Sequence, residues 1–178
     1  MWLLLFALMA SAPLKAPGLH SPMPGGTLAG YPGDTGLDIG GHFLSVHAIA
    51  SGTLEYSERG HTLWTRAPDT PHSVRLRLDE PIPWTDRRDP KRPRQRAVTH
   101  VYYTHMSTLR FAVTEGSAAS VHVSAGELLG RSGIGNGVPH LHIGLLLDGD
   151  VSQSSWEFIL REGEVRAVLG SYRNGARL

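Results

Sequence analysis

The sequence predicts a mainly β fold. Short runs of β-branched and aromatic residues alternate with turn formers, and the 178 residues include 21 glycines and 12 prolines. Residues 43–54 are typical of two strands around a bend, and residues 121–130 repeat that design with a turn at Gly126. This local likeness favours a barrel built from duplicated hairpins.

Length and composition indicate one folded domain. A chain of 178 residues can bury a substantial core but is too short for two independent domains of ordinary size. We therefore expect a signal peptide and linker over residues 1–24 and a single β domain over residues 25–178. The formal net charge of +1 argues against nucleic acid as the main partner, and the absence of cysteine excludes disulfides and thiolate metal sites.

The amino terminus predicts export. Residues 1–12 form an apolar run that ends in Ala-Ser-Ala, the small-residue pattern of a signal-peptide cleavage site. The run is too short to span a bilayer as a helix, and the proline- and glycine-rich residues that follow are typical of a linker. These features favour a periplasmic, cell-envelope or extracellular protein.

Two histidines carry the clearest chemical signal. His140 and His142 follow a glycine-rich segment, residues 130–137, which we expect to be a loop. In a strand these imidazoles lie about 7 Å apart on one face, while Leu141 and Ile143 point to the other. The pair can supply two metal ligands, or one ligand and one base, although His-x-His alone is also common on solvated strand faces.

Two carboxylates lie upstream, four residues apart. Asp34 and Asp38 stand among glycines and a proline, which disfavour a helix. In a straight strand they would be about 13 Å apart, too far to share one ion with bonds of about 2 Å. A shared site therefore requires the chain to fold back at Thr35 and Gly36, which glycine permits. The alternative is an ordinary Asp-rich turn.

A third segment, residues 98–106, has the β-branched and aromatic composition of a strand. Alternation places His105 on the face of Tyr103, and His100 on the opposite face with Tyr102. At most one of the two histidines can then belong to a given site.

Taken together and in order, four motifs make the chain resemble the lysostaphin or LytM-type zinc metallopeptidases of bacterial cell walls. The resemblance covers approximately residues 25–147, and the last motif is the most specific. The motifs are GDTGLDIG at 33–40, SVHAIASGTL at 45–54, YYTHMS at 102–107 and VSAGELLGRSGIGNGVPHLHIG at 123–144. The resemblance implies a compact antiparallel β structure of the duplicated hybrid motif type, with the site on one sheet face.

The resemblance also implies roles for particular residues. Asp38 and His142 become zinc ligands, and His105 and His140 become the catalytic histidines. The implied reaction is hydrolysis of peptide bonds in peptidoglycan cross-links or stem peptides. One position departs from the family pattern, because Asp34 stands where the first histidine ligand is expected, four residues before the aspartate.

The aspartate at this position leaves two hypotheses. If Asp34 is a ligand, an Asp, Asp, His set holds one Zn²⁺, and the harder Mn²⁺ competes better than at a site with a neutral imidazole. If Asp34 is not a ligand, zinc binds weakly and the domain is a non-catalytic module that binds the cell wall or activates another hydrolase.

Two further segments carry predictions of structure. Residues 85–97 are basic and interrupted by prolines, which predicts an exposed loop. Such a loop is either a solvated connection or a contact for an anionic wall polymer or membrane surface. Residues 156–160 are expected to form a short amphipathic helix that packs against the sheet.

Overall fold

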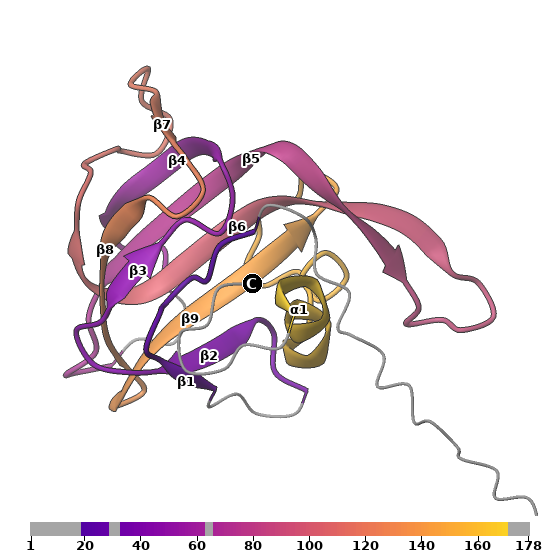
Figure 1. Ribbon diagram of the computed structural model, residues 1–178, viewed down its shortest axis with the longest axis horizontal. Coiled ribbons are helices and arrows are strands. Elements are labelled where there is room, and N and C mark those ends of the chain that lie inside the picture. Colours follow the sequence, from indigo (N-terminus) through magenta and orange to yellow (C-terminus); the bar gives the residue numbers. More distant parts are fainter. Residues whose placement is uncertain (1–18, 29–32, 63–65, 171–178) are drawn as a thin grey trace, which may run out of the picture.

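The computed structural model describes residues 19–28, 33–62 and 66–170. Within these ranges the chain forms one antiparallel sheet and one helix, α1, as predicted for a mainly β fold (Figure 1). The strand order is β1-β2-β9-β8-β6-β5-β4-β7, with β3 paired to β8 and β6 paired to both β8 and β9. The elements are β1 (Thr27–Leu28), β2 (Leu37–Gly40), β3 (Ser45–His47), β4 (Gly52–Arg59), β5 (His72–Asp86), β6 (Arg94–Leu109), β7 (Val121–Val123), β8 (Leu128–Gly135), β9 (Val138–Leu147) and α1 (Glu162–Leu169).

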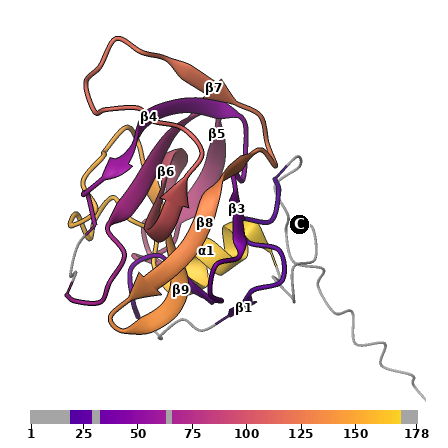
Figure 2. The same cartoon turned by 90° about the vertical axis from the view of Figure 1, so that its left-hand side faces the viewer.

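The two segments of similar design lie side by side. Strands β3 and β4 come from the first segment, and β7 and the start of β8 come from the second. Strand β3 pairs with β8, and β4 pairs with β7 (Figure 2). The likeness that predicted duplicated hairpins therefore corresponds to two segments that pair with each other, through β3 and β8 and through β4 and β7.

The core lies on one face of the long strands. Alternate residues of β5, β6 and β9, such as Leu76, Val101 and Ile143, are fully buried in one hydrophobic cluster. The hydroxyl of Tyr103 reaches across this cluster and accepts a hydrogen bond from the backbone N–H of Ile49 at 3.0 Å. The opposite face of β6 and β9 carries His140 and His142, and it also carries Tyr102 and Leu146, which pack with Ile159 in a second, smaller cluster.

The glycine-rich segment before His140 is a strand, which corrects the prediction of a loop. Strand β8 continues to Gly135, and only Asn136 and Gly137 turn the chain into β9. Both turn residues have positive φ, as a two-residue hairpin with the type I′ twist requires. The glycines inside β8 serve close packing: a Cβ at Gly133 would meet the Thr70 side chain, and one at Gly135 would meet the His105 ring.

The basic segment predicted as a loop over residues 85–97 is the tip of a β-hairpin, with strand residues at both of its ends. Strand β5 continues to Asp86 and β6 begins at Arg94, so that only residues 87–93 connect them. The predicted loop was too long at both ends, because residues 85–86 pair with residues 94–95 and the strands continue from there. Arg96 is held by two carboxylates, at 2.7 Å from Asp148 and 3.3 Å from Asp86.

The carboxy-terminal helix begins later than predicted. Residues 156–160 run beside the end of β9, where the N–H of Leu147 donates to Phe158 and the N–H of Leu160 donates to Leu145. Pairing with β9 thus excludes a helix there. Helix α1 follows, and its start is capped by the Glu164 carboxylate, which accepts a hydrogen bond from the Arg161 N–H at 2.8 Å.

The folded domain includes residues expected to belong to a linker. Leu19 and Met23 are buried in the core, and backbone hydrogen bonds join His20 to Ile49 and His47 to Pro22. The predicted signal sequence, residues 1–12, lies outside the described residues. Along the described part of the chain, no helix has the length and apolar character needed to cross a membrane.

Outside the pocket described below, His100 should make stability depend on pH. Burial lowers its pKa below the usual 6.5, and Arg75 and Arg77 add to this, although Glu55 lies 3.4 Å away and opposes it. The unfolded chain then binds more protons below about pH 6.5, so the free energy of unfolding should rise as pH increases toward that value. Urea denaturation of the metal-free protein should show a smaller rise in His100→Gln.

The matched control is His122→Gln, because His122 is an exposed histidine on β7. An unchanged pH dependence in His100→Gln would contradict the assignment.

Candidate metal centre

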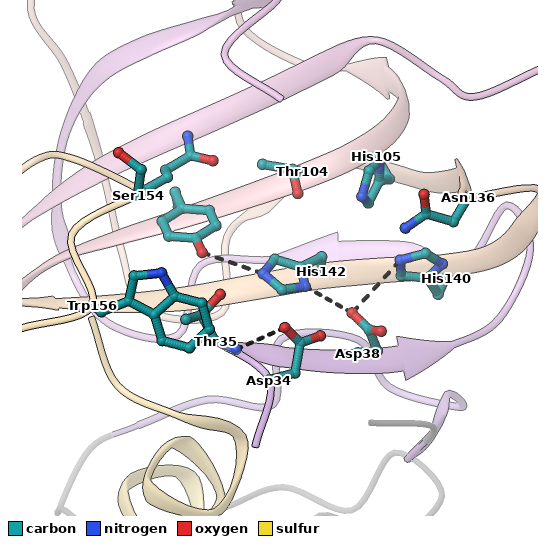
Figure 3. A pocket seen from close by; sticks show the side chains of 12 residues that line it. Asp34, Thr35, Asp38, Thr104, His105, Asn136, His140, His142, Ser154 and Trp156 are labelled. Carbon is teal, nitrogen blue, oxygen red and sulfur yellow. Dashed lines mark hydrogen bonds and ion pairs between the residues drawn. The ribbon is translucent and has the colours of Figure 1, made fainter. Parts of the chain in front are cut away.

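The site is built where β2 pairs with β9. Asp38 lies directly opposite His142, and Gly40 lies opposite His140. The Asp38 Oδ1 atom is 2.7 Å from Nδ1 of His142 and 3.6 Å from Nε2 of His140 (Figure 3). The two histidines therefore share one face, as strand alternation predicted, and both point toward the same carboxylate.

Asp34 joins this group because the chain folds back just before β2. Gly36 has φ +77° and donates its N–H to the Leu160 carbonyl, and the Asp34 carboxylate accepts the Thr35 N–H at 2.8 Å. One donor atom each from Asp34, Asp38 and His142 then lie within 4.8 Å of one another. The bend required by the sequence for a shared site is present at the expected residues.

His105 reaches the site through a β-bulge, which corrects its predicted face. Tyr103 pairs with Val74 and Met106 pairs with His72, so three steps on β6 match two on β5. His105 takes up the extra residue with φ +60°. The bulge breaks the alternation, and His105 lies on the side of Tyr102 rather than of Tyr103.

The three imidazoles are close together. The ring centroid of His105 is 4.9 Å from that of His140 and 6.4 Å from that of His142. His105 is 5% exposed, and its Nδ1 atom is buried without a hydrogen-bond partner in the described structure. Such an unpaired buried atom is uncommon in folded proteins and is more readily explained at a functional site.

Tyr102 contacts the site from β6 and is not among the site residues predicted from the sequence. Its hydroxyl lies 3.2 Å from Nε2 of His142, and the two rings stack at 5.7 Å. Because the ionised Asp38 can only accept, Nδ1–H of His142 donates to it and Nε2 accepts from the tyrosine. Burial raises the pKa of Tyr102, which keeps its hydroxyl protonated as a donor.

The charges in the site are set by burial and by neighbouring imidazoles. Burial by itself would raise the pKa of Asp38, but the hydrogen bond from His142 and the nearby histidines lower it below the usual 3.8. Burial, followed by the effects of His140 and His142, lowers the pKa of His105 to about 4. At neutral pH the site therefore contains an ionised Asp38 and a neutral His105.

These side chains line one pocket of about 210 Å³, which contains all five residues singled out from the sequence. None of the described lining residues is Lys or Arg. Gln153, Ser154 and Trp156 complete the wall and were not predicted, because the segment after β9 has no recognisable motif. The full lining is Asp34, Thr35, Asp38, Tyr102, Thr104, His105, Asn136, His140, His142, Gln153, Ser154 and Trp156.

The donor set suits a divalent metal ion. Two carboxylates and one imidazole are ligand types that zinc accepts, and three protein ligands leave a position for water or substrate. The hydrogen bond of 2.7 Å between Nδ1 of His142 and Oδ1 of Asp38 brings two of these three ligand side chains together. Tyr102 would then hold the second nitrogen of His142, as second-shell partners of metal-bound histidines do.

Solved structures similar to this chain include the antimicrobial peptidase lysostaphin of Staphylococcus simulans, with 20% identity over 81% of this chain and 47% of that chain at TM-score 0.47. Its catalytic domain matches with 21% identity over 81% and 88%, at TM-score 0.46. A Pseudomonas aeruginosa protein proposed to be an M23 peptidase matches with 17% identity over 77% and 48%, at TM-score 0.47.

This chain covers about half the length of the full lysostaphin chain and of the Pseudomonas protein. No family model and no curated protein sequence matches it.

The bend at Gly36 should be essential for metal binding. A Cβ there would lie 2.6 Å from Nε2 of His142 and 2.6 Å from the Ile143 carbonyl. Gly36→Ala should therefore displace His142 and weaken zinc affinity by at least about tenfold, measured by chelator competition. Gly33→Ala is the matched control, since Gly33 also has positive φ but nothing within 4 Å of its Cβ position. Equal zinc affinity in the two variants would contradict this geometry.

Proposed function

We propose that this chain is an exported, metal-dependent endopeptidase that hydrolyses peptide bonds in peptidoglycan cross-links or stem peptides. The observation that carries the proposal is the convergence of Asp34, Asp38 and His142 with two further histidines in one pocket. The cell-wall substrate is supported by the motif resemblance. The absence of Lys and Arg from the described lining favours an internal peptide bond, because no cation pairs with a terminal carboxylate.

A divalent ion held by Asp34, Asp38 and His142 would supply Lewis-acid polarisation of a water molecule and of the scissile carbonyl. In this proposal His140 is the general base that accepts a proton from the attacking water. Its Nδ1–H donates to the Val138 carbonyl at 2.9 Å, which leaves Nε2 as an acceptor on the side of Asp38. A histidine fixed in one tautomer in this way suits the role of general base.

His105 has a different role because it is neutral and buried. A ring N–H of neutral His105 can donate a hydrogen bond to the oxygen on which negative charge develops. Its exclusion from solvent strengthens that interaction. The bulge in β6 thus supplies the second catalytic histidine in this proposal, opposite the base supplied by β9.

Asp34 should shift the choice of metal. With two carboxylates the protein ligands neutralise the ion's charge, so a bound water is less acidic than beside a neutral imidazole. Oxygen ligands also favour harder ions. We therefore expect Zn²⁺ or Mn²⁺ at this position, with Mn²⁺ a stronger competitor than at a site with two histidines.

The proposal predicts about one metal ion per chain. Elemental analysis after incubation with Zn²⁺ or Mn²⁺ should find it in the wild-type protein and not in Asp38→Ala or His142→Ala. The same two variants should lose release of peptides from peptidoglycan. His122→Ala should retain both, because its side chain is exposed on β7.

Absence of metal from the wild-type protein would overturn the peptidase proposal in favour of the non-catalytic wall-binding or activating module.

Replacing Asp34 by histidine should strengthen zinc binding. The change introduces a neutral nitrogen donor. A nitrogen donor favours Zn²⁺ over Mn²⁺ more strongly than a carboxylate does. In Asp34→His we expect zinc affinity to increase about tenfold and the selectivity for zinc over manganese to rise, measured by competition with a chromogenic chelator. Asp34→Ala should instead weaken binding of both ions. Equal zinc affinities in all three proteins would exclude Asp34 as a ligand.

A further inference from the structure

Beyond the proposed metal ligands and catalytic histidines, one wall of the pocket is formed by the segment between β9 and α1. Trp156 in this segment is 61% exposed, although tryptophan is usually largely buried. Its ring lies beside Thr35 and Asp34, whereas Asn136 marks the opposite end next to His140 (Figure 3). The metal ligands therefore lie between an exposed aromatic ring and a polar turn.

The backbone around Trp156 is held in place by an arginine. The guanidinium of Arg88 donates to the carbonyls of Trp156, Glu157 and Ile159 at 3.1, 2.9 and 2.8 Å. It also makes two hydrogen bonds of 3.1 Å to the Glu164 carboxylate. Because the backbone that carries Trp156 is already held in place, binding of a ligand there requires little ordering of the loop.

Gln153 lies in the same segment between β9 and α1 and is itself held by hydrogen bonds. Its amide nitrogen lies 2.7 Å from the His61 carbonyl and 3.2 Å from the Tyr56 hydroxyl, which uses both of its N–H donors. The Oε1 atom has no hydrogen-bond partner among the described residues. Because Gln153 lines the pocket, this oxygen is an available acceptor for a donor on the substrate.

We propose that Trp156 and Gln153 form a substrate subsite that binds a neutral peptide segment on one side of the scissile bond. The Trp156 ring packs against an apolar side chain or the flat face of a peptide unit. The Gln153 oxygen accepts a hydrogen bond from a backbone N–H of that segment. The subsite rests on the proposed function, because it assigns the substrate contacts of the same pocket.

Charge specifies which peptides fit. The pocket contains Asp34 and Asp38, and its described lining has no Lys or Arg. A bound divalent ion balances the two carboxylates and leaves no excess positive charge for a further anion. The subsite therefore selects segments whose carboxyl groups are amidated or joined in peptide bonds over segments with a free carboxylate.

The experiment measures binding separately from hydrolysis. In the metal-loaded His140→Ala protein, we measure the Kd of peptide dimers freed from the glycan strands of peptidoglycan by an amidase, using calorimetry. Adding Trp156→Ala should weaken binding about tenfold, and Trp156→Phe should restore most of it. Adding Gln153→Ala should weaken binding about threefold.

Phe43→Ala is the matched control, because Phe43 is an aromatic residue, 49% exposed, that does not line the pocket, and its Kd should stay within twofold. An unchanged Kd in Trp156→Ala would overturn the subsite, as would Trp156-dependent binding of peptide-free glycan strands. Trp156-dependent dimer binding, with no hydrolysis by the His140-containing protein, would support the subsite and reject the peptidase.

Discussion

The antiparallel pairing of β2 with β9 is the constraint on which the site depends. A slip of one residue would turn Asp38 into the core and Leu37 out of it, because side chains alternate between faces. The register is enforced by apolar burial: Leu37, Ile39, Leu141 and Ile143 are at most 1% exposed. Burial of each side chain contributes about 1.5–3 kcal/mol, which is the same range as one hydrogen bond to a charged group. Because four buried side chains together outweigh the single hydrogen bond between Asp38 and His142, the core decides where Asp38 lies.

Burial of polar groups on the other face of the same strands lowers the stability of the fold. Asp38, His105 and His140 are largely buried, and the unpaired Nδ1 atom of His105 costs about 1–3 kcal/mol. A set of apolar residues in these positions would stabilise the sheet more. The arrangement is understandable if these groups bind a metal ion and a substrate, since both would supply the missing partners.

The basic hairpin between β5 and β6 has a structural role that its composition did not indicate. Charge and prolines suggested a solvated loop or a contact for anionic polymers. In the structure Arg88 and Arg96 turn inward and donate to carbonyls of the segment that carries Trp156. Planar guanidinium groups suit this task because several N–H donors can act in one plane. The β5–β6 hairpin is thereby joined by hydrogen bonds to the segment that forms the pocket wall at Trp156.

The sequence by itself determined the features that depend on local periodicity. It placed His140 and His142 on one face and located the bend between Asp34 and Asp38, because strand alternation and glycine φ are properties of neighbouring residues. Tertiary structure decided the rest. His105 changed face because register between β5 and β6 produced a bulge.

The glycine-rich segment formed a strand rather than a loop because it pairs with β3, β6 and β9. Its glycines fit there because Thr70 and His105, distant in sequence, occupy the space that a side chain at Gly133 or Gly135 would need. The wall at Trp156 depends on Arg88, 68 residues earlier in the chain. A contact between residues so far apart follows from the path of the whole fold, and no local pattern in the sequence records it.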